Sequence, residues 1–256
     1  MGIVRKQSII NALSSYVGII LGAINTILIF PNVFNDQPEH WGLIQLIIAY
    51  AMVGATYTTF GTPRILIRFF PKVKEKGQLL FLGIILPIVG FLLAVIAYYL
   101  FKEELFNLIG APKLLQSNFD LVFILIILNS FYKVFEAYSR AQLKSVIPVF
   151  LRDVFIRVYI MFILMFHGFK YIDFTLFLNL YLFGYFLIVL ILLLVLIRNN
   201  QLHIQLSLSS LDVKQLVKFG MYIVMGGATG VLVSKIDMMM IGKYLDLENV
   251  AYYALA

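Results

Sequence analysis

Apolar stretches long enough to cross a bilayer recur along this chain of 256 residues. A helix needs about 20 consecutive apolar residues to span a hydrocarbon core ~30 Å thick. Backbone polar groups cannot stay unpaired in lipid, and barrel strands would be ~10 residues of alternating character, so these stretches predict helices. The stretches are 8–30, 42–67, 79–101, 119–138, 149–166, 175–197 and 219–242. We therefore expect an all-α, polytopic transmembrane helical bundle with about seven spanning helices and the start of an eighth.

The composition excludes an ordinary soluble domain. Hydrophobic residues make up 62% of the chain and charged residues 13%, whereas soluble domains average about 25% charged residues. The formal charge of +7 is spread in short clusters between apolar stretches, so we expect no nucleic-acid partner. The chain has no cysteine, which excludes a disulfide framework, a thiolate nucleophile and a cysteine metal site.

The polar connections predict how the helices are oriented. Alternate connections are rich in Lys and Arg, and those between them hold most of the acidic residues. Because cytoplasmic loops carry an excess of Lys and Arg, the basic connections should be cytoplasmic. We expect a multi-pass protein of the plasma (inner) membrane with its N-terminus in the cytoplasm. The basic connections contain Arg5, Lys6, Arg68, Lys72, Lys74, Lys76, Arg140, Lys144, Arg152, Arg198, Lys214 and Lys218.

A long polar interval divides the chain into two parts. Residues 1–200 should form a first transmembrane lobe of about six helices, and 201–218 a cytoplasmic amphipathic connector. The first span and its acidic loop correspond in layout to the seventh span and its loop, about 210 residues later, which indicates a repeat. Residues 219–256 should therefore be the first helix and the beginning of an incomplete second lobe.

No catalytic apparatus is visible in the sequence. A Ser-His-Asp set, a zinc-protease motif, a phosphate-binding loop and a dinucleotide fingerprint are all missing, and the three histidines lie at loops or span ends. We expect no enzyme activity, cofactor or metal site. Polar residues inside the spans are costly in lipid, so they are the candidates for function.

The first span has one small, polar face. Asn11 and Asn25 share it with Ser14, Gly18 and Gly22, at 100° per residue. Two interpretations stay open: close helix packing through the small residues, or the wall of a wet cavity. The two asparagines exceed what packing alone requires.

Cations on the second and fourth spans are further candidates. Arg64 follows Pro63, which should bend the second span, and lies near the cytoplasmic interface, where it is either a topology anchor or a ligand-binding group. On the fourth span, Lys133, Glu136 and Arg140 form a charged ridge that must face the bundle interior. Glu136 can pair with either cation, or one cation can be left to meet an anionic ligand.

Arg157 is the deepest cation and the strongest single candidate. Counted from Pro148, it lies ~13 Å into the fifth span, close to the midplane of a ~30 Å core. On the seventh span, Asp237 shares a face with small and polar residues, where it either borders a cavity between the lobes or serves structure.

The seventh span resembles the segment that opens the second lobe of polysaccharide flippases, members of the multidrug, oligosaccharidyl-lipid and polysaccharide exporter superfamily. Residues 31–46, PNVFNDQPEHWGLIQL, resemble the opening of the first lobe. The resemblance covers the whole chain in layout and rests on hydrophobic motifs. In residues 218–256, the features that carry the resemblance are Asp237, Gly242, Leu245, an acidic loop, Val250, Tyr253 and Ala254.

The resemblance implies two six-helix lobes around a central cavity and a role in cell-surface polysaccharide biosynthesis, such as that of lipopolysaccharide or exopolysaccharide. Its members move a polyprenyl-diphosphate-linked oligosaccharide across the membrane by alternating access. The implied partners are that lipid-linked oligosaccharide, membrane lipids and the polysaccharide polymerase machinery. By chemistry alone, Arg64, Lys133 and Arg157 suit a diphosphate, with Asn11, Asn25 and Asp237 as further substrate-binding candidates.

Two other functions compete with a flippase. A cation-coupled multidrug exporter of the same superfamily should use intramembrane carboxylates, but the first span has no acidic residue. A membrane-embedded transferase should carry a histidine or an acidic pair in a long membrane-facing loop, and the sequence has no such loop.

Overall fold

The computed structural model describes residues 2–255, and all their side chains except those of residues 3, 4 and 228. Every regular element among these residues is helical. The first half contains α1 (Gly2–Ala23), the π-helix η1 (Ile24–Ile29), α2 (Phe30–Val33), α3 (Pro38–Thr58), α4 (Thr62–Phe69), α5 (Lys76–Leu100), α6 (Lys102–Ile109) and α7 (Lys113–Ser117). The second half contains α8 (Phe119–Ala141), α9 (Val146–Phe150), the π-helix η2 (Leu151–Phe155), α10 (Ile156–Gly168), α11 (Phe174–Arg198), α12 (Val213–Tyr244) and α13 (Leu247–Leu255).

The all-α, polytopic fold class is confirmed. Five helical segments of the described chain are long and apolar enough to cross a membrane, and α12, bent by 41°, makes six. The predicted fifth span is present as the run α9–η2–α10, but Arg152, Asp153 and Arg157 all lie within it and lower its hydropathy. These three charged residues distinguish the segment from the other predicted spans.

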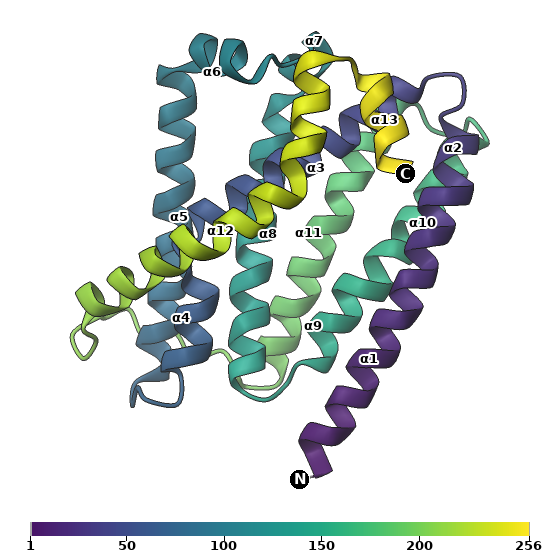
Figure 1. Ribbon diagram of the computed structural model, residues 1–256. Coiled ribbons are helices and arrows are strands. Elements are labelled where there is room, and N and C mark those ends of the chain that lie inside the picture. Colours follow the sequence, from purple (N-terminus) through teal and green to yellow (C-terminus); the bar gives the residue numbers. More distant parts are fainter. Residues whose placement is uncertain (1, 256) are drawn as a thin grey trace.

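The helices surround a core centred on α3, α8 and α11 (Figure 1). Side chains from several helices are fully buried there, among them Leu43, Leu79, Leu125, Leu164 and Phe177. The segment α1–η1–α2 packs along η2 and α10 at one side of the bundle, and α5 lies at the opposite side (Figure 1). α12 crosses the bundle obliquely against α3 and α4, and α13 packs on α3.

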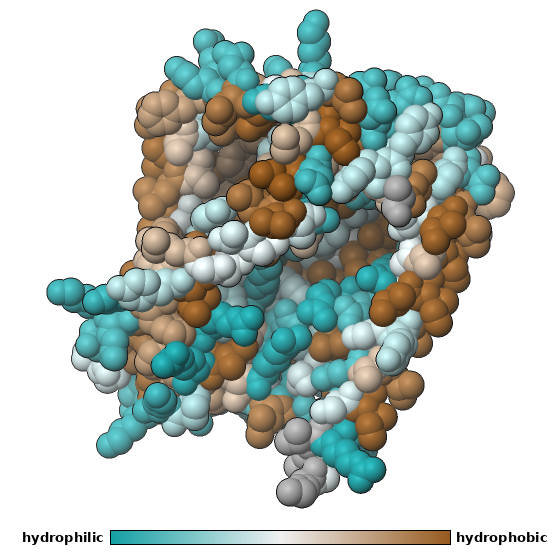
Figure 2. Space-filling view, in the orientation of Figure 1, coloured by the Kyte–Doolittle hydropathy of each residue, from teal (hydrophilic) through white to brown (hydrophobic). Residues whose placement is uncertain are grey.

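The outer surfaces of the bundle are apolar, as a lipid environment requires. Leu13 and Ile19 on α1 are 60% and 61% exposed, and Leu92, Leu93 and Ile96 on α5 are also exposed. Figure 2 shows hydrophobic side chains along the upper left edge and the right edge, and hydrophilic side chains in the hollow between α1 and α12. Soluble proteins rarely expose contiguous apolar surfaces of this extent, so this distribution fits a bundle surrounded by lipid.

The predicted second span, 42–67, is wrong as a single helix. α3 ends at Thr58, and α4 starts again at Thr62. Phe60 (φ 46°) and Gly61 (φ 70°) adopt the left-handed conformation, which turns the chain and cannot continue an α-helix. Pro63 therefore lies in the first turn of α4, where its missing N–H costs nothing, and does not bend a continuous helix.

Backbone packing fills the break between α3 and α4. A Cβ atom at Gly61 would lie 2.5 Å from the Gly220 carbonyl oxygen of α12, and one at Gly220 would clash with the Phe60 carbonyl. Beside the break, the hydroxyls of Thr58 and Ser130 are hydrogen bonded at 3.1 Å. Only glycine lets α12 approach this closely.

α12 begins inside the predicted connector. Asp212 caps it by accepting a hydrogen bond from the backbone N–H of Gln215, so residues 213–218 continue into the long helix. Residues 199–212 join α11 to α12 without a helix of their own. The division into two lobes at this interval stays a prediction.

Substituting Gly220→Ala should lower the stability of the chain by about 1–3 kcal/mol, because the new methyl group meets the Phe60 backbone, which cannot rotate away. Thermal unfolding of the detergent-purified chain measures the effect. Gly226→Ala on the same helix is the control, since nothing lies within 4 Å of its Cβ position. Equal melting temperatures for the two variants would contradict the proposed close approach.

Candidate functional site

A central cavity of about 440 Å³ lies between α3, α8, η2, α10 and α11. Its apolar lining comes from α3, α8, α10 and α11, and its charged lining from α8, η2 and α10. The polar residues that line it are Asn129, Tyr132, Lys133, Glu136, Arg152, Arg157 and Tyr185. Three cations and one carboxylate in a lining inside a membrane bundle favour an anionic occupant.

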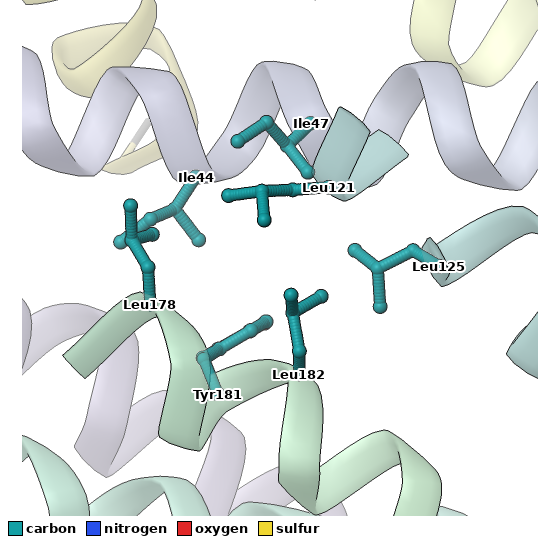
Figure 3. Close-up of a pocket in the computed structure, with 7 residues that line it drawn as sticks. All are labelled: Ile44, Ile47, Leu121, Leu125, Leu178, Tyr181 and Leu182. Atoms are coloured by element: carbon teal, nitrogen blue, oxygen red, sulfur yellow. The ribbon is translucent and has the colours of Figure 1, made fainter. Parts of the chain in front are cut away.

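A tightly packed apolar region of α3, α8 and α11 lies next to this cavity. Ile44 and Ile47 of α3, Leu178 and Leu182 of α11, and Leu125 of α8 line a gap of only about 10 Å³ (Figure 3). Leu125 lines both spaces, so the polar cavity borders on a dry, well-packed region. The charges are thus confined to one part of the bundle interior.

Lys133 has no carboxylate partner within 4.0 Å in the described part of the chain. Its half-buried ammonium group donates a hydrogen bond to the Thr56 hydroxyl of α3 at 3.3 Å. Glu136 lies one turn further along α8 but pairs with two arginines and not with Lys133. Among the described residues, the structure therefore lacks the Lys133–Glu136 pair, and the alternative in which Lys133 meets an anionic ligand stays a prediction.

Glu136 begins a chain of alternating charges. Its Oε1 atom lies 2.9 Å from Arg140 Nη2 and 2.9 Å from Arg152 Nη1. Arg152 Nε lies 2.7 Å from Asp153 Oδ1, and Asp153 Oδ2 accepts a hydrogen bond from Ser15 on α1 at 2.7 Å. Both carboxylates are therefore neutralised by arginine, and the network joins α8, η2 and α1.

Arg157 lies against the small face of α1. Its guanidinium donates a hydrogen bond to the Gly18 carbonyl, and its own carbonyl accepts one from Asn25 Nδ2 at 2.9 Å. A Cβ atom at Gly22 would lie 2.6 Å from Arg157 Nη1, and one at Gly18 would lie 2.5 Å from the Asp153 carbonyl oxygen. The small residues thus serve packing, and that packing makes room for a cation at the cavity wall.

Residues 37–256 match the model of a family described as polysaccharide biosynthesis protein. The chain belongs to this family. The match fits the polysaccharide flippases of the exporter superfamily that the sequence resembles, so this is a multi-pass membrane protein of polysaccharide biosynthesis. No curated protein and no solved structure matches the chain.

The other predicted site residues of this family member lie outside the cavity lining. Asn11 donates a hydrogen bond to the Ser145 hydroxyl at 2.8 Å, which ties α1 to the segment before α9. Arg64 is exposed on α4, and Asp237 is exposed on α12, where it accepts a hydrogen bond from the Tyr253 hydroxyl at 3.3 Å. The structure therefore brings together Lys133, Arg157 and the adjoining Asn25, and leaves the other three apart.

Sequence reasoning did not select Arg152 and Asp153 as site residues. The sequence predicts Arg152 in a basic connection, whereas the structure places it on the π-helical turn η2, in the cavity lining, with Asp153 next to it and directed to Ser15. The spacing of Asp153 and Arg157, four residues apart, is a sequence signal that could have found Asp153. Within the described residues, no group of three or more His, Asp or Glu side chains is arranged to hold a metal ion.

A double-mutant cycle on this family member tests the charge network. Glu136→Gln and Arg152→Gln should each destabilise the chain, and their coupling free energy should be about 1 kcal/mol, discounted because Arg152 is 44% exposed. The measurement is the unfolding free energy of wild type, both single variants and the double variant. Strict additivity would mean that the two side chains act independently and would contradict the network.

Proposed function

We propose that this protein is a flippase that moves a polyprenyl-diphosphate-linked oligosaccharide across the plasma membrane by alternating access, for cell-surface polysaccharide biosynthesis. The observation that supports it best is Lys133, a cation that lines the same cavity as Arg157 and forms no ion pair with a carboxylate of the described residues. An unpaired interior cation is costly in lipid unless an anionic ligand meets it. Family membership points to the same class of substrate.

The diphosphate is the part of the substrate that the cavity suits. Arginine forms bidentate hydrogen bonds with phosphate oxygens, and lysine acts on them as a point charge. Asn129 and Tyr185 add polar groups to the lining that can meet the adjoining sugar. The prenyl chain needs no protein site, because it can stay in the surrounding lipid.

The carboxylates argue against the competing exporter of cationic drugs. Such an exporter needs an acidic group that is free to bind Na⁺, a proton or a cationic drug. Glu136, which lines the cavity, and the neighbouring Asp153 are both engaged with arginines, which leaves the positive charge in excess there, and Asp237 lies outside the cavity lining. We infer a transporter and not an enzyme, with lipid-linked oligosaccharide, membrane lipids and the polysaccharide polymerase machinery as partners.

Cell complementation tests the proposal. In the full-length protein, Lys133→Gln and Arg157→Gln should each strongly reduce surface polysaccharide and cause the lipid-linked precursor to accumulate. Losing one charge-assisted hydrogen bond costs about 1.5–3 kcal/mol, or about tenfold and more in substrate affinity. Lys72→Gln and Arg198→Gln are matched controls, because both side chains are exposed and lie outside the cavity lining. Membrane abundance is measured for every variant.

Three results would decide against this function or this site. A normal amount of surface polysaccharide in both cavity variants, at normal membrane abundance, would show that Lys133 and Arg157 do not bind the substrate. Loss of polymer without accumulated precursor would place the defect in another step of synthesis. A change in drug resistance with normal polymer would move the protein to the exporter branch.

The predicted orientation has its own test. The chain has no cysteine, so a single introduced cysteine is the only thiol that a membrane-impermeant maleimide can label. We propose that the N-terminus is cytoplasmic, so Lys170→Cys should react in intact cells and Lys74→Cys only after permeabilisation. The unsubstituted chain is the control, and the reverse pattern would invert the topology.

A further inference from the structure

A second polar pocket lies at the end of the bundle that carries the predicted cytoplasmic connections. Three segments far apart in sequence build it: the start of α5, the loop after α8 and the segment after α11. Its volume is about 560 Å³, and none of its lining residues lines the central cavity. We call it the end pocket. The side chains that characterise it are Lys76, Gln142, Lys144, Gln201 and His203.

Two sharp turns shape this end pocket. Leu143 (φ 59°) follows α8 and Asn200 (φ 50°) follows α11, and in both places the left-handed residue folds the chain back on the helix. The backbone N–H of Lys144 then donates to the Ser139 carbonyl at 2.9 Å, and that of Gln201 donates to the Leu196 carbonyl at 3.0 Å. The backbone at both walls is therefore fixed.

Further contacts hold the segment after α11 in place. The Tyr138 hydroxyl, on a side chain that is 2% exposed, donates to the Gln201 carbonyl at 2.9 Å. A Cβ atom at Gly77 would lie 2.7 Å from the His203 carbonyl oxygen, and the Gln205 N–H donates to the Gly77 carbonyl at 3.3 Å. The end pocket is thus bounded by packed and hydrogen-bonded backbone on three sides.

The charge of the end pocket is positive. Its lining contains Lys76, Lys144 and His203, and no carboxylate among the described residues. Neither lysine forms an ion pair within the described part of the chain; Lys76 Nζ lies 4.8 Å from the centre of the Phe70 ring. Glu75, the acidic neighbour of Lys76, lies outside the lining and accepts a hydrogen bond from Gln205 Nε2 at 2.9 Å.

Gln201 supplies an independent observation. It is only 8% exposed, and its buried Nε2 amide group has no hydrogen-bond partner among the described residues. Its backbone carbonyl already accepts from Tyr138, so the side-chain amide is a donor that still needs an acceptor. A buried donor left unsatisfied costs about 1–3 kcal/mol, which a ligand oxygen would recover.

We propose that the end pocket binds a phosphate-class anion, with Lys76 and Lys144 providing charge and Gln201 a buried hydrogen-bond donor. A phosphate group carries several oxygens that can accept from all three side chains at once. The same chemistry belongs to free phosphate and to the headgroup of an anionic phospholipid. The proposal does not depend on what the central cavity transports.

Binding to the purified full-length protein tests the proposal with two ligands. Radiolabelled inorganic phosphate is measured by equilibrium dialysis in phospholipid-free detergent, and phosphatidylglycerol retention is measured against phosphatidylcholine by native mass spectrometry. Lys76→Gln/Lys144→Gln should bind the preferred ligand about tenfold more weakly or worse. Lys214→Gln/Lys218→Gln is the matched control, because it removes two exposed lysines of α12 that lie outside the end pocket.

The outcomes separate the two sources of the anion. Selective retention of phosphatidylglycerol without phosphate binding identifies a lipid headgroup, and phosphate binding without that retention identifies the free anion. Lys76→Arg/Lys144→Arg should keep binding, which distinguishes lost charge from lost folding. Binding of neither ligand by wild type, or equal binding by the glutamine variant and its control, would overturn the proposal.

Discussion

Arg157 can lie within the bundle because α1 provides it with both a hydrogen-bond acceptor and space. A guanidinium inside the bundle must find its hydrogen-bond acceptors in the protein, because lipid supplies none. The backbone carbonyl of Gly18 is one such acceptor. Gly22 leaves the volume that the guanidinium occupies. This contact, together with the hydrogen bonds of Asn11 to Ser145 and of Ser15 to Asp153, holds the small-residue face of α1 against the charged wall of the central cavity.

The same requirement explains how the remaining charges are arranged. Arg140, Glu136, Arg152 and Asp153 form a chain of two cations and two carboxylates that ends on Ser15 of α1, so their charges balance without a ligand. Among the described residues, Lys133 donates a hydrogen bond to the Thr56 hydroxyl and forms no ion pair. The cavity lining therefore combines a balanced ionic network with an adjacent cation that an anionic substrate would pair.

Sequence predicted what depends on local composition and missed what depends on tertiary contacts. The apolar stretches predicted helices, because lipid permits few other structures, and helical periodicity placed Lys133 and Glu136 on one ridge. The break after Thr58 depends on how Gly61 packs against Gly220, about 160 residues away. The ion pair between Arg152 and Glu136 involves a residue of the π-helical turn η2, and the sequence carries no recognised pattern that predicts such a turn.

α8 carries parts of both proposed sites, and their linings adjoin along this helix. The lining of the central cavity ends at Glu136, and that of the end pocket begins at Tyr138, about 3 Å further at 1.5 Å per residue. The two linings share no residue, and each has its own lysine: Lys133 in the central cavity and Lys144 in the end pocket. Arg140 lies between these lysines in sequence and is paired with Glu136. The two sites therefore share a helix but not a cation, which is why substitutions can remove the charge of one site and leave that of the other.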